Sequence, residues 1–76
     1  MNDGRRKRIA KISEELFTLR DEVMDLKDEE QEYYDNMPES FQGGEKGDKA
    51  QTAIDALDSA VQSLEEATGY LDEVTA

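Results

Sequence analysis

The sequence predicts an all-α protein, in which two long helices form an antiparallel helical hairpin that dimerises into a four-helix bundle or coiled coil. Apolar residues recur at alternating steps of three and four in two segments of nearly equal length. A single stretch containing Pro and Gly separates these segments. Further apolar residues lie beside both stripes, and they need another surface to cover them. The 76 residues are expected to form one domain, residues 1–76.

The first helix is predicted over about residues 4–36. Its stripe consists of Ile9, Ile12, Leu16, Leu19, Val23 and Leu26. Asp3 is a suitable capping residue at the start of this helix. Pro38 disfavours helical geometry at Met37, so the helix is expected to end just before it.

The second helix is predicted over about residues 45–74, after a turn at about 37–44. Its stripe consists of Ile54, Leu57, Val61, Leu64 and Leu71. The turn contains Pro38, Gly43 and Gly44, and a connection of this length readily reverses the chain. Phe41 is expected to fill the end of the bundle.

Self-association is expected because a two-helix hairpin covers only one face of each helix. The predicted oligomer interface comprises Leu16, Phe17, Val23, Met24, Ala53, Ala60 and Ala67. A chain this short also buries little surface by itself, which favours a homodimer. A monomeric hairpin held by contacts with a target is the alternative. The sequence leaves the direction of docking between the two copies open.

The composition argues against an enzyme. The chain has no Cys and no His, which excludes thiol redox chemistry, disulfides, imidazole acid-base catalysis and the common soft metal sites. No catalytic residues and no cofactor are expected. Asp28, Glu32 and Asp35 share one helix face and offer oxygens to a hard cation, but the loop pattern of a Ca²⁺ site is absent. No metal is therefore expected.

Charge is distributed unevenly along the chain. The net charge is -11, yet residues 1–11 hold five basic side chains against one acidic residue, Asp3. The negative field of a chain with this net charge repels nucleic-acid phosphates, so direct DNA binding is not expected. No apolar run approaches the roughly 20 residues that span a bilayer, and no signal peptide follows the basic start. We therefore expect no membrane association and a location in the cytoplasm of a bacterial host cell.

The densest acidic cluster lies near the end of the first helix and includes aromatic residues. The predicted partner-binding residues are Asp28, Glu29, Glu32, Tyr34 and Asp35. An aromatic side chain in a polar rim is a frequent anchor of protein interfaces. Alternatively, the carboxylates imitate a phosphate backbone, or they form a solvated face that keeps the protein soluble.

The basic start is the other anomaly, because four cations in the first turns oppose the helix dipole. One interpretation is neutralisation by the end of the second helix, through Glu65, Glu66, Asp72 and Glu73. The other interpretation is an anion site formed by Arg5, Arg6 and Arg8 that receives a phosphate or an acidic partner; in a dimer, two such sites could converge on a nucleotide or nucleic acid.

The tracts DEEQEYYDNMPES (residues 28–40) and GEKGDKAQTAIDALDSAVQSLEEA (residues 44–67) resemble small acidic helical-hairpin proteins of bacteriophages. The resemblance implies a phage-type accessory protein that binds and inhibits or modulates a host protein, such as an antiviral defence component. It includes no catalytic motif and does not extend to Arg5 and Arg8. Two alternatives stay open: an oligomeric sponge for a nucleotide signal, and a purely structural coiled-coil module.

Overall fold

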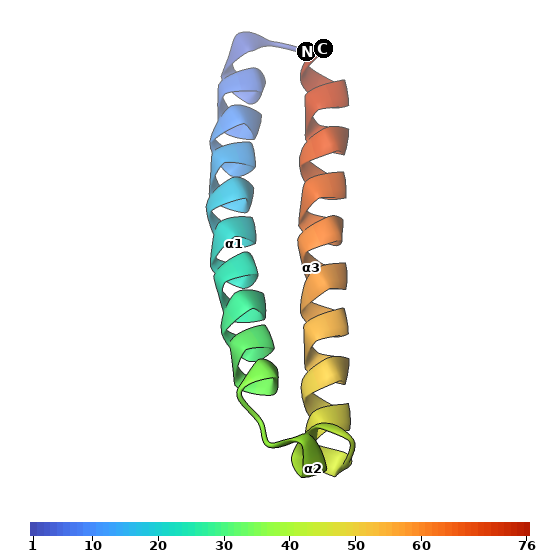
Figure 1. The fold of residues 1–76 in the computed structure, drawn as a ribbon. Helices are drawn as coiled ribbons and strands as arrows, with labels where there is room; N and C mark the ends of the chain where they lie inside the picture. Colours follow the sequence, from blue (N-terminus) through green and yellow to red (C-terminus); the bar gives the residue numbers. More distant parts are fainter.

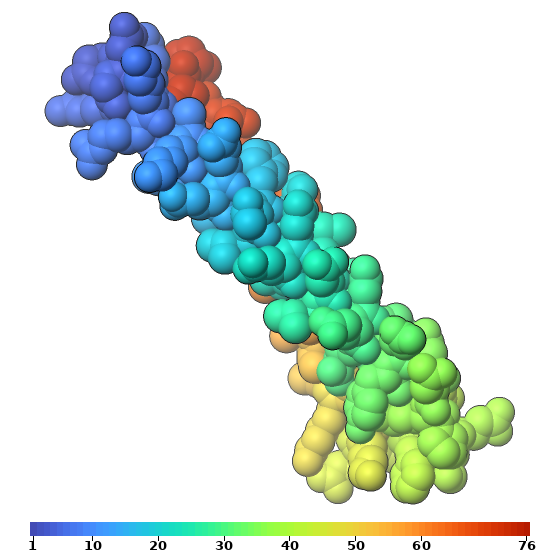
Figure 2. All heavy atoms as spheres, turned by 90° about the vertical axis from the view of Figure 1, so that its left-hand side faces the viewer, coloured from blue at the N-terminus to red at the C-terminus, as the bar shows by residue number.

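The computed structural model describes residues 1–76 as two long antiparallel helices joined by a short connection (Figure 1). Helix α1 spans Asp3–Asp35, α2 spans Glu39–Gln42 and α3 spans Glu45–Thr75. The two chain ends lie together at one end of a rod whose Cα dimensions are 58 × 15 × 12 Å. Figure 2 shows this rod from the side of α1. The prediction of an all-α helical hairpin is confirmed.

The start of α1 differs from the prediction in its capping residue. Asn2, not Asp3, is the N-cap, and its side-chain oxygen accepts a hydrogen bond of 2.8 Å from the backbone N–H of Arg5. Asp3 lies within the first turn, where its charge suits the helix dipole. It also forms an ion pair of 3.4 Å with Arg6.

The connection contains a single-turn helix where only a turn was expected. Helix α2 follows Pro38, whose carbonyl accepts hydrogen bonds from the N–H groups of Phe41 and Gln42 at 2.9 and 3.1 Å. The Gln42 amide reaches back and donates to the carbonyl of Tyr34 at 3.0 Å. These bonds fix α2 against the end of α1, so the connection is an ordered part of the rod.

Helix α3 presents a regular stripe toward α1. Its buried residues are Gly47, Ala50, Ile54, Val61 and Thr68. Ala50, Ile54 and Val61 make up the buried apolar core. Leu57, Leu64 and Leu71 are half-buried along the same stripe, as the heptad pattern predicts.

The predicted stripe of α1 is divided between the hairpin and solvent. Ile9, Leu16 and Val23 are half-buried. The residue three positions after each of them is exposed: Ile12 at 46%, Leu19 at 48% and Leu26 at 54%. The half-buried residues between them are instead polar: Ser13, Arg20 and Lys27. Long basic side chains can cover apolar surface with their alkyl stems while the charged group reaches outward. Helix α1 is therefore rotated away from the predicted seam, with half of the predicted stripe exposed.

Lys27 forms the one ion pair between α1 and α3. Its ammonium nitrogen lies 2.8 Å from one carboxylate oxygen of Asp58, and the other oxygen accepts a hydrogen bond from Gln62. The hydrogen bond from Lys27 is the main cause that lowers the pKa of Asp58 below its ordinary 3.8. The same bond raises the pKa of Lys27 above its ordinary 10.5.

We expect Asp58→Asn to lower stability at neutral pH, with a difference that disappears in acid. The pKa of Asp58 is lower in the folded state, so its stabilising effect is present above 3.8 and is lost as the pH falls through the folded-state pKa. Urea unfolding of both proteins from about pH 7 to about pH 2 measures this gap. A gap that stays constant in acid would show that the carboxylate charge contributes nothing.

None of the three helices combines the length and apolar character needed to cross a bilayer.

Candidate functional site

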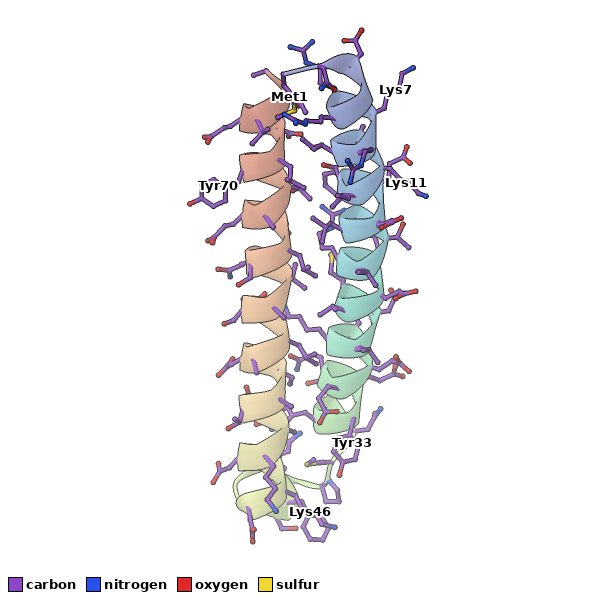
Figure 3. All side chains as sticks on the ribbon, turned by 180° about the vertical axis from the view of Figure 1, so that it is seen from behind. Met1, Lys7, Lys11, Tyr33, Lys46 and Tyr70 are labelled. Atoms are coloured by element: carbon purple, nitrogen blue, oxygen red, sulfur yellow. The ribbon has the colours of Figure 1, made fainter.

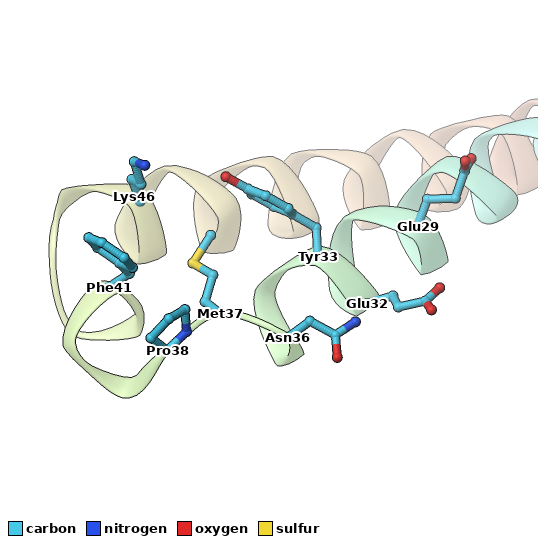
Figure 4. A pocket seen from close by; sticks show the side chains of 8 residues that line it. All are labelled: Glu29, Glu32, Tyr33, Asn36, Met37, Pro38, Phe41 and Lys46. Carbon is cyan, nitrogen blue, oxygen red and sulfur yellow. The ribbon is translucent and has the colours of Figure 1, made fainter.

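The most pronounced hollow lies at the turn end of the rod and has a volume of about 540 Å³ (Figure 4). Three segments meet there: the last turns of α1, the connection with α2, and the first turn of α3. The lining residues are Glu29, Glu32, Tyr33, Asn36, Met37, Pro38, Phe41 and Lys46. We call this hollow the turn-end site.

The turn-end site combines apolar side chains with a charged rim. Figure 4 shows Met37 between the rings of Phe41 and Tyr33, with Glu29 and Glu32 farther along α1. The Lys46 ammonium lies 4.9 Å from the centroid of the Phe41 ring, within cation-π distance.

Phe41 therefore does not fill the bundle end as predicted. It is 48% exposed and packs beneath Lys46 on the outside of the rod. The reason is the short helix α2, which orients residues 39–42 so that Gln42, rather than Phe41, reaches the end of α1.

The structure divides the predicted partner-binding residues. Glu29 and Glu32 line the turn-end site. Asp28 and Asp35 are exposed but do not line it, and Asp35 accepts a hydrogen bond from Gln31 at 3.0 Å.

Of the two adjacent tyrosines in this region, Tyr33 and not Tyr34 is the exposed one. Tyr34 is half-buried, whereas Tyr33 is 54% exposed. The heptad spacing of the sequence could have identified Tyr33 as the exposed tyrosine. Tyr33 lies seven residues after Leu26, in the exposed row, and Tyr34 lies seven after Lys27, in the row that faces α3.

At the opposite end, the predicted ion pairs between the basic start and the end of α3 are not formed. Arg6 pairs with Asp3, and no other basic residue of the first two turns lies within ion-pair distance of a carboxylate. Lys7 and Lys11 point away from α3 in Figure 3, which explains why they do not reach its acidic side chains. A shallow hollow at this end is lined by Arg5, Arg8, Ile9 and Ile12.

The predicted oligomer-interface residues lie in different environments. Leu16 and Val23 are half-buried in the hairpin seam, and so are Ala53 and Ala67 at its border. Ala60, Phe17 and Met24 are exposed. The Arg20 guanidinium lies 5.0 Å from the centroid of the Phe17 ring and covers part of it.

No group of three acidic side chains is arranged to hold a metal ion. The exposed side chains of the turn-end site offer apolar contact, carboxylates and one ammonium group. Such groups recognise a complementary surface through burial and charge.

Comparisons of the chain with protein-family models, with curated proteins and with solved structures found no match.

Proposed function

We propose that the protein is a non-enzymatic interaction module that captures a protein partner with its turn-end site. The observation that carries this proposal is the cluster of Tyr33, Met37 and Phe41, which leaves two large aromatic rings half exposed beside Glu29 and Glu32. Aromatic and Met side chains are enriched at the centres of interfaces, and a polar rim surrounds them.

The charge of the site specifies the kind of partner. Glu29 and Glu32 belong to a chain with a net charge of -11, so a basic surface is attracted from a distance and a nucleic acid is repelled. A partner segment with an apolar side chain for the floor and Lys or Arg for the rim fits these groups best.

As a biological role, we propose that the protein is a phage-type accessory protein whose partner is a host protein, such as an antiviral defence component. The resemblance of residues 28–40 and 44–67 to small acidic phage proteins supports this role, and these tracts include most of the turn-end site. Binding would inhibit or modulate the host protein by covering its basic surface.

We further propose that the working form is a homodimer with four long helices. Support comes from the small core: Ala50, Ile54 and Val61 are the only buried hydrophobic residues of the hairpin. Chains of this size gain little stability from burial alone and commonly add association.

Charge reversal at the turn-end site tests partner capture. We expect Glu29→Lys with Glu32→Lys to abolish capture of a host protein from lysate, because the reversed rim repels a basic partner. The matched control is Asp55→Lys with Glu66→Lys, which makes the same charge change on exposed positions of α3.

Capture is measured by mass spectrometry of the retained proteins, with circular dichroism to verify the helices of each variant. Equal loss in both double variants would mean that net charge, not the turn-end site, holds the partner. If even the native protein retains no host protein, the structural-module alternative replaces this proposal.

The unpaired guanidinium groups of Arg5 and Arg8 favour a second candidate, a sponge for a nucleotide signal. Their hollow also includes Ile9 and Ile12, which offer apolar contact to a base while the guanidinium groups bind phosphate. This candidate requires bound small molecules on the protein as it is isolated from cells.

A further inference from the structure

One flank of the rod carries two parallel rows of apolar residues, all exposed except Ala53 and Ala67, which are half-buried. The large row is on α1 and consists of Ile12, Leu19, Leu26 and Tyr33. The small row is on α3 and consists of Ala53, Ala60, Ala67 and Val74. Members of each row are seven residues apart, so each row runs along its helix like the position of a coiled-coil heptad.

The Lys27–Asp58 ion pair shows that both rows lie on the same flank. This pair bridges the helices on one side of the seam. Successive helix residues are about 100° apart, so Leu26, next to Lys27, lies across the seam from the pair. Ala60, two residues after Asp58, is likewise turned about 160° away from it. We call this shared surface the heptad flank.

The same ion pair matches the two rows in height. Since Lys27 and Asp58 lie at one level of the rod, Leu26 and Ala60 lie at nearly the same level as each other. Because α1 and α3 are antiparallel, a step of seven residues back along α1 corresponds in height to a step of seven residues forward along α3. Leu19 therefore lies beside Ala67, and Ile12 lies beside Val74.

The heptad flank is large enough for a stable contact. Its rows contain no charged residue, although 38% of the chain is charged. The large row spans about 32 Å of helix, and two helices side by side give a surface on the order of 600 Å². Two such surfaces together reach the lower limit of stable interfaces, about 1,200 Å².

We infer that a second copy of the chain covers the heptad flank, with a two-fold axis along the rod. Helix α1 of each copy then packs on α3 of the other, so that every large side chain lies against an alanine or Val74. This arrangement specifies the geometry of the dimer that forms part of the proposed function, and it rests on that dimer.

Charge distinguishes this arrangement from one with the axis across the rod. Glu15, Glu22 and Glu29 each follow a member of the large row by three positions and therefore border it. An axis across the rod would place α1 on α1 and bring these glutamates against their counterparts. With the axis along the rod they face the residues that border the small row, namely Ala56, Ser63 and Tyr70.

The charges at the ends of the helices also favour a two-fold axis along the rod. The basic start of α1, with Arg5 and Arg8, meets the end of the other copy's α3, which contains Glu73. The acidic end of α1 meets the start of α3, which holds that helix's basic residues, Lys46 and Lys49. Opposite charges are thus adjacent at both ends.

Both turn-end sites also lie at one end of the bundle. Tyr33 is there shared between the dimer contact and the site. Phe41, Glu29 and Glu32, which belong to neither row, remain to engage a partner.

Cysteine cross-linking tests the arrangement directly, because the chain has no native Cys. Single variants Leu19→Cys and Ala67→Cys are mixed, allowed to exchange subunits and oxidised. We expect the mixed disulfide to form at least about ten times more than either self-linked product, since only that pair brings Cβ atoms within disulfide range. Ile12→Cys with Val74→Cys is an independent pair with the same expectation, should one variant fold poorly.

A mixture of Leu19→Cys and Leu26→Cys is the decisive comparison. Abundant cross-linking in this mixture would show an axis across the rod and overturn the inference while leaving the dimer intact. Absence of all these disulfides in a protein with the mass of two copies would place the interface on another flank. A protein with the mass of one copy would refute the proposed dimer itself.

Discussion

Leu26→Glu is expected to separate the dimer into single copies. The dimer contains this position twice, and each substitution removes the burial of a leucine, which contributes about 1.5–3 kcal/mol. Together the two losses raise the dissociation constant by on the order of 10²- to 10⁴-fold. The new carboxylate also lies beside Glu22 and Glu29, which adds repulsion. Sedimentation equilibrium over a series of concentrations measures the dissociation constant.

Met24→Glu is the matched control on the opposite flank. Met24 is 43% exposed and lies two residues before Leu26 on the same helix. It is also three residues before Lys27, on the side of the Lys27–Asp58 ion pair. We expect it to leave the dimer intact. If Met24→Glu separates the copies and Leu26→Glu does not, the interface contains Phe17 and Met24 in place of the heptad flank.

Gly47→Ala is expected to destabilise the protein strongly through the connection. Gly47 is buried in the first turn of α3, where a Cβ atom would overlap the carbonyl group of Gln42 and lie 2.8 Å from its Cα. These are backbone atoms of α2, so the connection itself must move. Overpacking of this kind costs about 1–3 kcal/mol and occasionally more. Urea unfolding at a fixed protein concentration measures the loss, since the stability of a dimer depends on concentration.

Gly69→Ala, in contrast, is expected to stabilise the protein. Gly69 is exposed inside α3, and a Cβ atom there would meet no other atom within 4 Å. Alanine in a helix is favoured over glycine by about 0.5–1 kcal/mol, so this variant should be more stable. Equal effects of the two substitutions would show that α2 does not pack against Gly47 as described.

The heptad spacing was sufficient to predict both long helices because it records, residue by residue, which side must be covered. Pro38 likewise marked the end of α1 to within a residue. The rotation of α1 about its own axis could not be predicted from this spacing. Ile12 and Ser13 are both near the seam, and the apolar pattern favours Ile12, whereas the structure turns Ser13 toward α3. Arg20 and Lys27 lie in the same row as Ser13, and their alkyl stems can pack against α3. A sequence pattern that classes each residue only as apolar or polar does not show this.

The turn-end site could be predicted only in part. The clustering of carboxylates at Glu29 and Glu32 was evident from sequence, and the heptad position of Tyr33 would have identified the exposed aromatic residue. The contact between Phe41 and Lys46 depends on helix α2, which brings together segments that local patterns treat separately. Three-dimensional packing of the connection thus determined which aromatic residues face solvent.

Native mass spectrometry of the protein, purified gently from a bacterial lysate, tests the central claim of a protein-binding dimer. We expect a species of twice 8.6 kDa without added small molecules. A species of 8.6 kDa across concentrations at which the helices are folded would contradict it. A higher oligomer carrying a few hundred daltons of bound material would also contradict it, in favour of the nucleotide sponge.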